Sequence, residues 1–266
     1  MNNLTAIHIA DNYLINPANP IVTNLIGVGG TGSRMLSELA AMHAALQALG
    51  HPGLMVHAYD DDRITVPNLG RQRFAESELG LYKSVAAINR INRFYGTDWK
   101  AVPYKFDSRH SHKMPGGGMA NLYISCVDSA SARFAIASFL DNISYSRYQR
   151  SKPLYWMDLG NSKDTGQVIL STVRPIKQPQ SVLYRTVAAL PKITEEFKDL
   201  LAGQQDDNEP SCSFEEAITK QDLFINPVVA TYAAKLLFQL FRTGMTDTRG
   251  VFINLKNFKT EPLKVA

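Results

Sequence analysis

Cysteine is scarce in this sequence, and its scarcity excludes two kinds of protein. Only Cys126 and Cys212 occur among the 266 residues. Two cysteines cannot build a disulfide framework, and they cannot supply a zinc site that has four cysteine ligands. The sequence therefore predicts a protein of a reducing compartment, and the cytoplasm is the expected location.

Long apolar runs and blocks of like charge are also absent. The first residues, MNNLTAIHIADNYL, lack the basic region and apolar stretch of a secretory signal. The apolar runs elsewhere are far shorter than a membrane span. The formal net charge is +4, and the basic residues are scattered along the chain. We therefore expect no membrane association, and nucleic acid is not the partner that we expect.

The distribution of apolar residues indicates an α/β fold. Hydrophobic residues make up 45% of the chain, enough for a large core. Buried-strand patterns alternate with segments that have helical spacing. The expected strands are 21–28, 54–60, 99–106 and 122–128, and the expected helices are 33–49, 77–96 and 131–143. This alternation predicts a Rossmann-like, mostly parallel sheet with helices on both faces.

The pattern changes after about residue 152. Segments 153–161 and 167–173 resemble two strands joined by a polar turn, which predicts that antiparallel strands continue the sheet. Residues 173–211 contain four prolines and an acidic stretch, as expected of an exposed crossover. A strong apolar stripe predicts a helix over 226–242, and 251–265 closes the chain as one or two strands. Residues 1–20 form an N-terminal extension, with a hairpin as one arrangement.

A glycine-rich loop joins the first expected strand to the first expected helix. The glycines Gly27, Gly29 and Gly32 form G-x-G-x-x-G, and Gly30 adds a fourth. Such a loop lets backbone N–H groups approach a phosphate at a helix N-terminus. No G-K-[ST] follows, so this is not a Walker A site. An ordinary strand-to-helix turn is the alternative, and the motif alone does not separate ATP from NAD or FAD.

Asp60 ends the second expected strand, where an acidic side chain usually binds ribose hydroxyls. A dehydrogenase and an ATP-binding enzyme would both use that contact. The next residues separate them, because the chain continues with Asn-Leu-Gly-Arg-Gln at 68–72 and with Lys83. A dehydrogenase needs neither feature, so ATP is the preferred nucleotide.

These motifs together resemble the ThiF/MoeB/HesA-like proteins of the ubiquitin-activating enzyme superfamily. The resemblance covers roughly residues 21–172 and, more weakly, the helix at 226–242. It depends on the glycine loop, on Asp60-Asp61-Asp62 with Asn68-Leu69-Gly70-Arg71-Gln72, on Gly80-Leu81-Tyr82-Lys83, and on Asp128 with Arg133. The segments Pro210-Ser211-Cys212-Ser213 and Gln221-Asp222-Leu223-Phe224-Ile225-Asn226 are most similar to the ThiF family of the PRTRC system.

The resemblance implies ATP and Mg²⁺ as cofactors and a role for each matched residue. Asp60 would hold the ribose, with Asp62 beside it, while Asn68 and Arg71 would lie near the phosphates. Lys83 would place a charge on the phosphates, and Asp128 would bind Mg²⁺. The implied catalytic residues are Arg71, Lys83, Asp128 and Cys212. The alternatives are that Arg71 and Lys83 are solvated surface charges and that Asp128 caps a helix.

The resemblance also implies a function and a domain division. Residues 21–172 would be a nucleotide-binding adenylation domain, completed by the crossover, helix and closing strands of 173–266. The chain would be an ATP-dependent adenylyltransferase that activates the C-terminal carboxylate of a small ubiquitin-like or sulfur-carrier-like protein, and it would be a homodimer. No arginine precedes Arg34, although such family members usually carry one. A non-catalytic nucleotide-binding or scaffold descendant is therefore the alternative.

The two cysteines have different expected roles. Cys126 lies in an apolar strand and is expected to be an inert core residue. Cys212 precedes a short expected helix and is the candidate acceptor of the activated acyl group. The neighbouring acidic residues would raise its pKa, and a small structural residue is the alternative.

Overall fold

The computed structural model describes residues 4–69, 72–145, 149–202 and 221–266. Its main sheet has eight strands in the order β11-β10-β7-β6-β5-β2-β3-β4. The strands are β2 (Ile21–Ile26), β3 (Leu54–Tyr59), β4 (Lys100–Val102), β5 (Leu122–Ser125), β6 (Tyr155–Asn161), β7 (Thr165–Thr172), β10 (Thr248–Asn254) and β11 (Lys259–Lys264).

The sheet combines a parallel half with an antiparallel half. Strands β6, β5, β2, β3 and β4 are parallel, whereas β7, β10 and β11 each pair antiparallel with their neighbours. The predicted α/β class and the antiparallel continuation are confirmed. Helices α2, α3 and α4 follow the parallel strands β2, β3 and β5. Short turns join β6 to β7 and β10 to β11, whereas a long segment that contains α8 joins β7 to β10.

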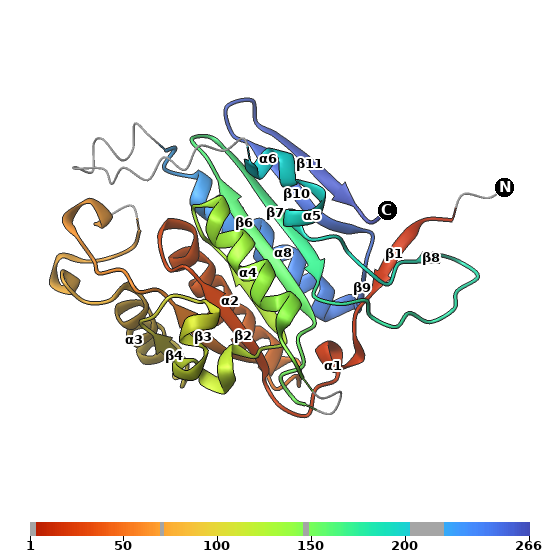
Figure 1. Cartoon of the computed structure of the whole chain (residues 1–266), viewed down its shortest axis with the longest axis horizontal. Helices are drawn as coiled ribbons and strands as arrows, with labels where there is room; N and C mark the ends of the chain where they lie inside the picture. The colour runs from red at the N-terminus through yellow and green to blue at the C-terminus, as the bar shows by residue number, and fades with distance from the viewer. Residues whose placement is uncertain (1–3, 70–71, 146–148, 203–220) are drawn as a thin grey trace.

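Helices cover both faces of this sheet. They are α2 (Gly30–Ala48), α3 (Lys83–Tyr95), α4 (Ala130–Asn142), α5 (Ile193–Glu196), α6 (Lys198–Ala202) and α8 (Ile225–Thr243). Successive strand residues contribute to two separate cores, because side chains alternate across a sheet. Leu25 belongs to the core beneath α2, α3 and α8, whereas Ile26 belongs to the core beneath α4 and α5. Figure 1 shows α4 and α8 on opposite faces of the sheet.

The apolar stripe of α8 is used within the chain. Val229, Ala233, Leu237 and Leu240 are buried in the core that α8 shares with α2. Leu236, which the sequence places on the same stripe, is only partly buried against that core. The stripe therefore functions mainly as core packing in the single chain.

The N-terminal strand does not form a hairpin. β1 (Ala6–Ile9) pairs parallel with β8 (Arg185–Thr186) and antiparallel with β9 (Met245–Thr246). The chain then turns into the short helix α1 (Asn12–Ile15), whose N-cap Asp11 accepts a hydrogen bond from the Tyr13 backbone N–H at 2.9 Å. The hairpin interpretation is wrong because both partner strands lie more than 170 residues away in the sequence, where no local pattern reveals them.

Two elements differ most from the ranges that the sequence predicted. The helix expected over 77–96 begins only at Lys83, because the preceding residues form a short 3₁₀ turn (Glu76–Glu78) and Gly80 adopts a φ of 81°. It ends where expected, at Gly96, which adopts the left-handed conformation favoured at helix C-termini. The strand expected over 99–106 is reduced to β4 (Lys100–Val102). Within the described ranges, no helix is both long and apolar enough to cross a membrane.

Candidate functional site

The carboxyl ends of the parallel strands lie at one edge of the sheet. Open α/β sheets bind their ligands at this edge. β2 ends before Gly27, β3 ends before Asp60, and β5 ends shortly before Asp128. Helices α2, α4 and α8 begin at the same edge, on the left of Figure 1 beside the loop that follows β3. The topology therefore brings together the glycine loop and two of the predicted acidic residues at one end of the molecule.

Three of the four loop glycines are required by close packing. Gly27 has a φ of 89°, and a Cβ there would lie 2.7 Å from the backbone oxygen of Cys126. A Cβ on Gly32 would lie 1.9 Å from the Gly27 oxygen, and one on Gly30 would lie 2.9 Å from the Asn226 amide. Any larger residue at these positions would displace the loop.

Gly29 is different, because the space beside it is open. The nearest atom to a Cβ placed there is Oε1 of Gln72, at 4.0 Å. Gln72 is only 7% exposed, and its Oε1 has no hydrogen-bond donor among the described residues. An unpaired buried acceptor costs free energy unless a ligand or water satisfies it. This acceptor beside an open glycine, at the start of α2, fits a site for a polar ligand.

The side chain of Asp60 is bonded directly to the glycine loop. Its Oδ2 accepts a hydrogen bond from the Val28 backbone N–H at 2.6 Å, and its Oδ1 accepts one from the Asp62 N–H at 3.0 Å. Burial raises the pKa of Asp60 to about 6, although the nearby Lys83 charge and the Val28 bond oppose that rise. The carboxylate is therefore positioned against the loop and is sensitive to pH close to neutrality.

Lys83 is held at the same place by two contacts with Asp62. Its Nζ lies 2.7 Å from Asp62 Oδ2, and its backbone N–H donates to the Asp62 carbonyl at 2.9 Å. The adjacent Ser84 hydroxyl donates to the Asp60 carbonyl at 2.8 Å. Lys83 is buried, whereas Asp62 is exposed. The ion pair thus directs the first residue of α3 toward the loop that follows β3.

Asn68 is used within its own turn. Its Oδ1 accepts hydrogen bonds from the Thr65 backbone N–H at 3.0 Å and from the Thr65 hydroxyl at 3.1 Å. These bonds close the short 3₁₀ turn Val66–Asn68 and fix the start of the Asn-Leu-Gly-Arg-Gln segment. Arg71 and Cys212, both predicted as catalytic, lie outside the described residues.

Asp128 is exposed, and it does not cap the helix that follows it. The N-cap of α4 is Ser129, whose hydroxyl accepts a hydrogen bond from the Ala132 backbone N–H at 3.2 Å. Among the described residues, no three His, Cys, Asp or Glu side chains converge on one point. A Mg²⁺ ion at Asp128 would therefore need phosphate oxygens and water as its other ligands, which is how this ion usually binds.

Cys126 follows β5 and is bonded into the sheet. Its backbone N–H donates to the Ile26 carbonyl at 2.8 Å, and its side chain packs against the core beneath α2. Burial raises the pKa of its thiol. A thiol that resists ionisation is a poor nucleophile, as expected of a core residue.

A side-chain network beside the glycine loop was not predicted. The Thr31 hydroxyl donates to Asn226 Oδ1 at 2.7 Å and accepts from Asn161 Nδ2 at 2.7 Å. Gln221 donates to Asn161 Oδ1 at 2.7 Å and accepts from Asn226 Nδ2 at 3.0 Å. The network joins the first turn of α2 to β6 and α8. It therefore fixes the N-terminal end of α2, which the glycine loop forms. The only sequence signal was the resemblance of segment 221–226 to one family.

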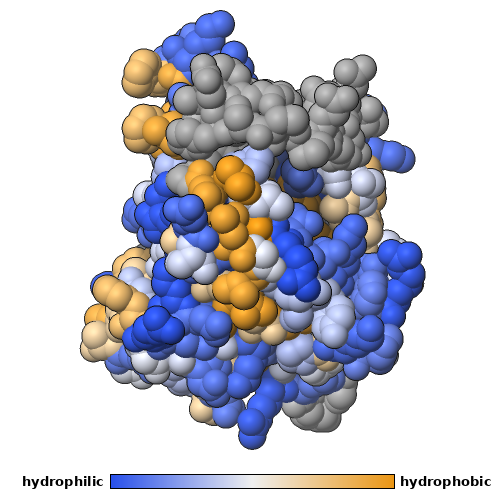
Figure 2. Space-filling model, turned by 90° about the vertical axis from the view of Figure 1, so that its left-hand side faces the viewer, coloured by the Kyte–Doolittle hydropathy of each residue, from blue (hydrophilic) through white to orange (hydrophobic). Residues whose placement is uncertain are grey.

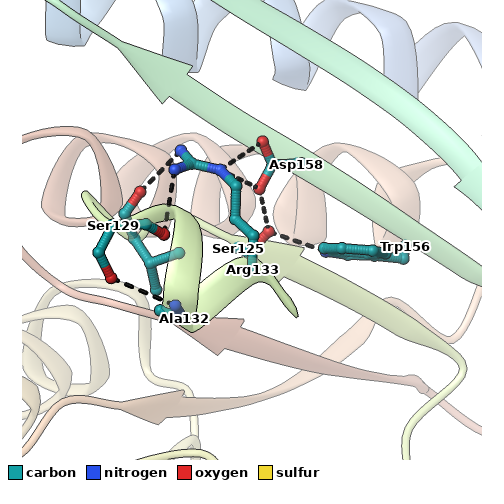
Figure 3. A network of polar contacts seen from close by, with 7 residues as sticks. Ser125, Ser129, Ala132, Arg133, Trp156 and Asp158 are labelled. Atoms are coloured by element: carbon teal, nitrogen blue, oxygen red, sulfur yellow. Dashed lines mark hydrogen bonds and ion pairs between the residues drawn. The ribbon is translucent and has the colours of Figure 1, made fainter. Parts of the chain in front are cut away.

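A second buried network fixes the loop that carries Asp128 (Figure 3). Arg133 Nε donates to both carboxylate oxygens of Asp158, at 3.0 and 3.1 Å, and Nη2 donates to the Val127 carbonyl at 2.8 Å. The Ser125 hydroxyl donates to Asp158 Oδ1 at 2.6 Å. Arg133 and Asp158 are only 2% and 1% exposed. Because each charge is paired and hydrogen-bonded, Arg133 has a structural role between α4, β5 and β6.

Figure 2 looks onto the side of the molecule where these helices begin. The surface is mostly hydrophilic, and an apolar strip crosses the centre of the view. A face of mixed polarity suits ligands that combine apolar and charged parts, as nucleotides do.

Comparison with known proteins agrees with this architecture. The sequence matches the ThiF family over residues 22–266. No curated protein matches the chain. Among solved structures, E. coli MccB with AMPCPP and MccA is 14% identical with a TM-score of 0.57, and MccB with ATP is 14% identical with a TM-score of 0.52. PaaA is 12% identical with a TM-score of 0.58.

The chain is shorter than these neighbours. The similarity covers 92% of this chain in each case, but only 63% of MccB and 64% of PaaA. At such low identity these likenesses show the shared fold. The match to the family sequence pattern extends from β2 through β11 and includes the whole site. The chain therefore belongs to the ThiF family.

Proposed function

We propose that this protein binds ATP at the glycine loop and adenylates the C-terminal carboxylate of a small ubiquitin-like or sulfur-carrier-like protein. The observation that carries the proposal is the bond between Asp60 and the Val28 N–H, which joins a ribose-binding carboxylate to the loop. MccB, which shares the fold, has been solved with ATP and with AMPCPP and MccA.

The residues present fit ATP and Mg²⁺. The open space at Gly29 and the start of α2, where the N-cap Gly29 has no side chain to cap the helix amides, suit the phosphates. Asp60 accepts hydrogen bonds and has the chemistry to take ribose hydroxyls. Lys83 lies beside Asp60 as a point charge for the phosphates. Asp128 is exposed at the same sheet edge, where it would hold Mg²⁺, and the ion would neutralise phosphate charge.

The proposed reaction is a nucleotidyl transfer. A carboxylate oxygen of the partner forms a bond to the α-phosphorus of ATP, and the bond from that phosphorus to the pyrophosphate oxygen breaks. The products are an acyl-adenylate and pyrophosphate. Lys83 would stabilise charge on the phosphoryl oxygens, and Arg71 would do the same by resemblance to the family. The Thr31–Asn226 bond would keep the first turn of α2 in place during this step.

A non-catalytic descendant that binds a nucleotide or a partner is the second candidate. One observation favours it. Lys83 forms an ion pair with Asp62 that would have to loosen before Lys83 could move fully onto a phosphate. Catalysis and simple binding are distinguished by whether pyrophosphate is exchanged.

The test is exchange of radiolabelled pyrophosphate into ATP, with Mg²⁺ and a small sulfur-carrier-like protein that ends in glycine. The proposal predicts exchange by the wild type and a loss of at least a hundredfold in Lys83→Ala. Lys100→Ala is the matched control, because Lys100 is exposed on β4 and, among the described residues, its side chain bonds to Asp98 alone. ATP binding without exchange in any combination would support the non-catalytic candidate instead.

Several finer assignments belong to this proposal. We propose that the chain lies in the PRTRC branch of the family, that it is a homodimer, and that 21–266 form one nucleotide-binding domain with 1–20 as an extension. β10 and β11 support the single domain because they extend the same sheet. Dehydrogenase activity remains the least supported alternative, and the cytoplasmic location stays a prediction from the sequence.

A further inference from the structure

A cavity of about 280 Å³ lies between α2 and α3, beside the glycine loop. Its floor is apolar and includes Leu36, Ala87 and Ile91. Phe94 and Tyr95 form its rim, with ring centroids 4.9 Å apart, and Phe94 is 79% exposed. An exposed aromatic pair beside an apolar floor is unusual on a monomer surface and indicates an interaction site. We call this the α2–α3 groove.

Arginines form the other wall of the α2–α3 groove. Arg73 donates from Nη1 to the Ser37 hydroxyl at 3.1 Å, and Arg90 donates from Nη1 to the Arg73 carbonyl at 2.5 Å. Arg73 has a φ of 59°, a conformation that a non-glycine residue adopts only when its surroundings impose it. The Arg73 side chain is thus positioned over the groove by its neighbours.

The two arginines of the groove differ in their local compensation. Within the described part of the chain, Arg73 forms no ion pair with a carboxylate, whereas Arg90 pairs with Glu78 at 3.6 Å. Burial lowers the pKa of Arg34, which does not line the groove, and repulsion from Arg73 lowers it further. The Nε of Arg34 is buried and has no hydrogen-bond acceptor among the residues that the structure describes. Arg73 therefore gives the groove a positive charge that would favour an acidic ligand.

We propose that the α2–α3 groove is a docking site for the polypeptide partner, and that it binds a segment in which a carboxylate side chain stands next to a large apolar one. The carboxylate would pair with Arg73 and Arg90, because a guanidinium binds a carboxylate through two parallel hydrogen bonds. The apolar side chain would cover Leu36, Ile91 and Phe94.

The lining of the groove favours a polypeptide over a nucleotide phosphate. A phosphate chain would satisfy the arginines but would leave the apolar floor in contact with charged oxygens. The position also suits a partner. Ser33 lines the groove and bonds through its N–H to the Gly29 carbonyl at 3.0 Å. Arg73 follows Gln72, whose Oε1 lies beside Gly29 and has no donor among the described residues. A folded partner bound in this groove would lie beside the glycine loop, where its C-terminal carboxylate would react. This inference therefore rests on the proposed function.

The test uses two capped peptides, acetyl-Glu-Leu-Glu-Leu-amide and acetyl-Gln-Leu-Gln-Leu-amide, titrated into the full chain with labelled Leu and Ile methyl groups. We expect the glutamate peptide to shift the Leu36 and Ile91 methyl signals and to bind about fivefold more tightly than the glutamine peptide. Arg73→Gln should abolish that difference. Arg242→Gln is the matched control, because Arg242 is an exposed arginine at the far end of α8.

Three results would overturn the inference. One is equal binding of the two peptides, and another is an equal effect of Arg73→Gln and Arg242→Gln. The third is a wild-type dimer that Arg73→Gln converts to a monomer, because the groove would then be a subunit interface. ATP titration separates this inference from the proposed function. Gly29→Val should lose ATP binding and keep the peptide, whereas Arg73→Gln should lose peptide discrimination and keep ATP.

Discussion

Asp60 gives the sharpest prediction, because its ionisation affects both stability and nucleotide binding. Its pKa of about 6 exceeds the ordinary value of 3.8, a difference that corresponds to about 3 kcal/mol. A carboxyl group whose pKa is higher in the folded than in the unfolded protein stabilises the fold while it is protonated. The whole contribution is present at a pH below the pKa of the unfolded state. That contribution is lost as the pH rises through about 6. The ionised form of Asp60 therefore lowers the stability of the folded protein at the near-neutral pH where the protein would function.

The perturbation is Asp60→Asn, which is neutral at every pH. One of the two N–H donors, on Val28 or Asp62, then loses its acceptor, at a constant cost of about 1 kcal/mol. Relative to wild type, the variant should gain about 2.5 kcal/mol of unfolding free energy between pH 4 and pH 7.5, because part of the difference of about 3 kcal/mol is already lost at pH 4. Urea denaturation across this range measures the difference, and Asp61→Asn, an exposed neighbour, is the control.

The same ionisation should control ribose binding. Only about one-tenth of Asp60 is ionised at pH 5, so wild type should bind adenosine about tenfold more weakly at pH 5 than at pH 7.5. Adenosine is the suitable ligand because it carries no phosphate that titrates in this range. Asp60→Asn should bind weakly at both values. If the stability difference between variant and wild type stays constant from pH 4 to pH 7.5, burial does not control this carboxyl and the reasoning fails.

Three further predictions follow from the site. Gly32→Ala should lower the unfolding free energy by about 3 kcal/mol or more and remove nucleotide binding, because its Cβ would lie 1.9 Å from the Gly27 oxygen. Thermal melts and ATP titration test this, and unchanged values would contradict the loop geometry. Asp128→Ala should remove most of the Mg²⁺ dependence of ATP binding while AMP affinity stays within about twofold, and retained dependence would exclude Asp128 as the ligand. Cys212→Ala should still exchange pyrophosphate into ATP but form no thiol-sensitive adduct with the partner; an adduct that persists would make Cys212 structural.

The sequence predicted the features of this fold that depend on local pattern. Alternating apolar segments identified the parallel strands and the helices between them, and the four glycines identified the loop. The pattern also predicted that Asp60 ends a strand, and it directly follows β3. The bond that joins Asp60 to the Val28 N–H depends on the three-dimensional turn, so the pattern could not predict it.

Long-range side-chain contacts could not be predicted. Thr31 and Asn226 are 195 residues apart, and neither residue type signals a bond between them. The pairing of β1 with β8 and β9 was missed for the same reason. The late start of α3 reflects the Lys83–Asp62 contacts and the turn at Gly80, which override a helical pattern that begins at residue 77.

Isothermal titration of the wild-type protein with ATP, AMP and NAD, each with and without Mg²⁺, tests the central claim most directly. A ThiF-family nucleotide site at the glycine loop predicts that ATP binds and that Mg²⁺ strengthens its binding. It also predicts that AMP binds without need of the metal and that NAD binds at least tenfold more weakly than ATP. NAD affinity equal to that of ATP, or ATP affinity that Mg²⁺ leaves unchanged, would contradict the account.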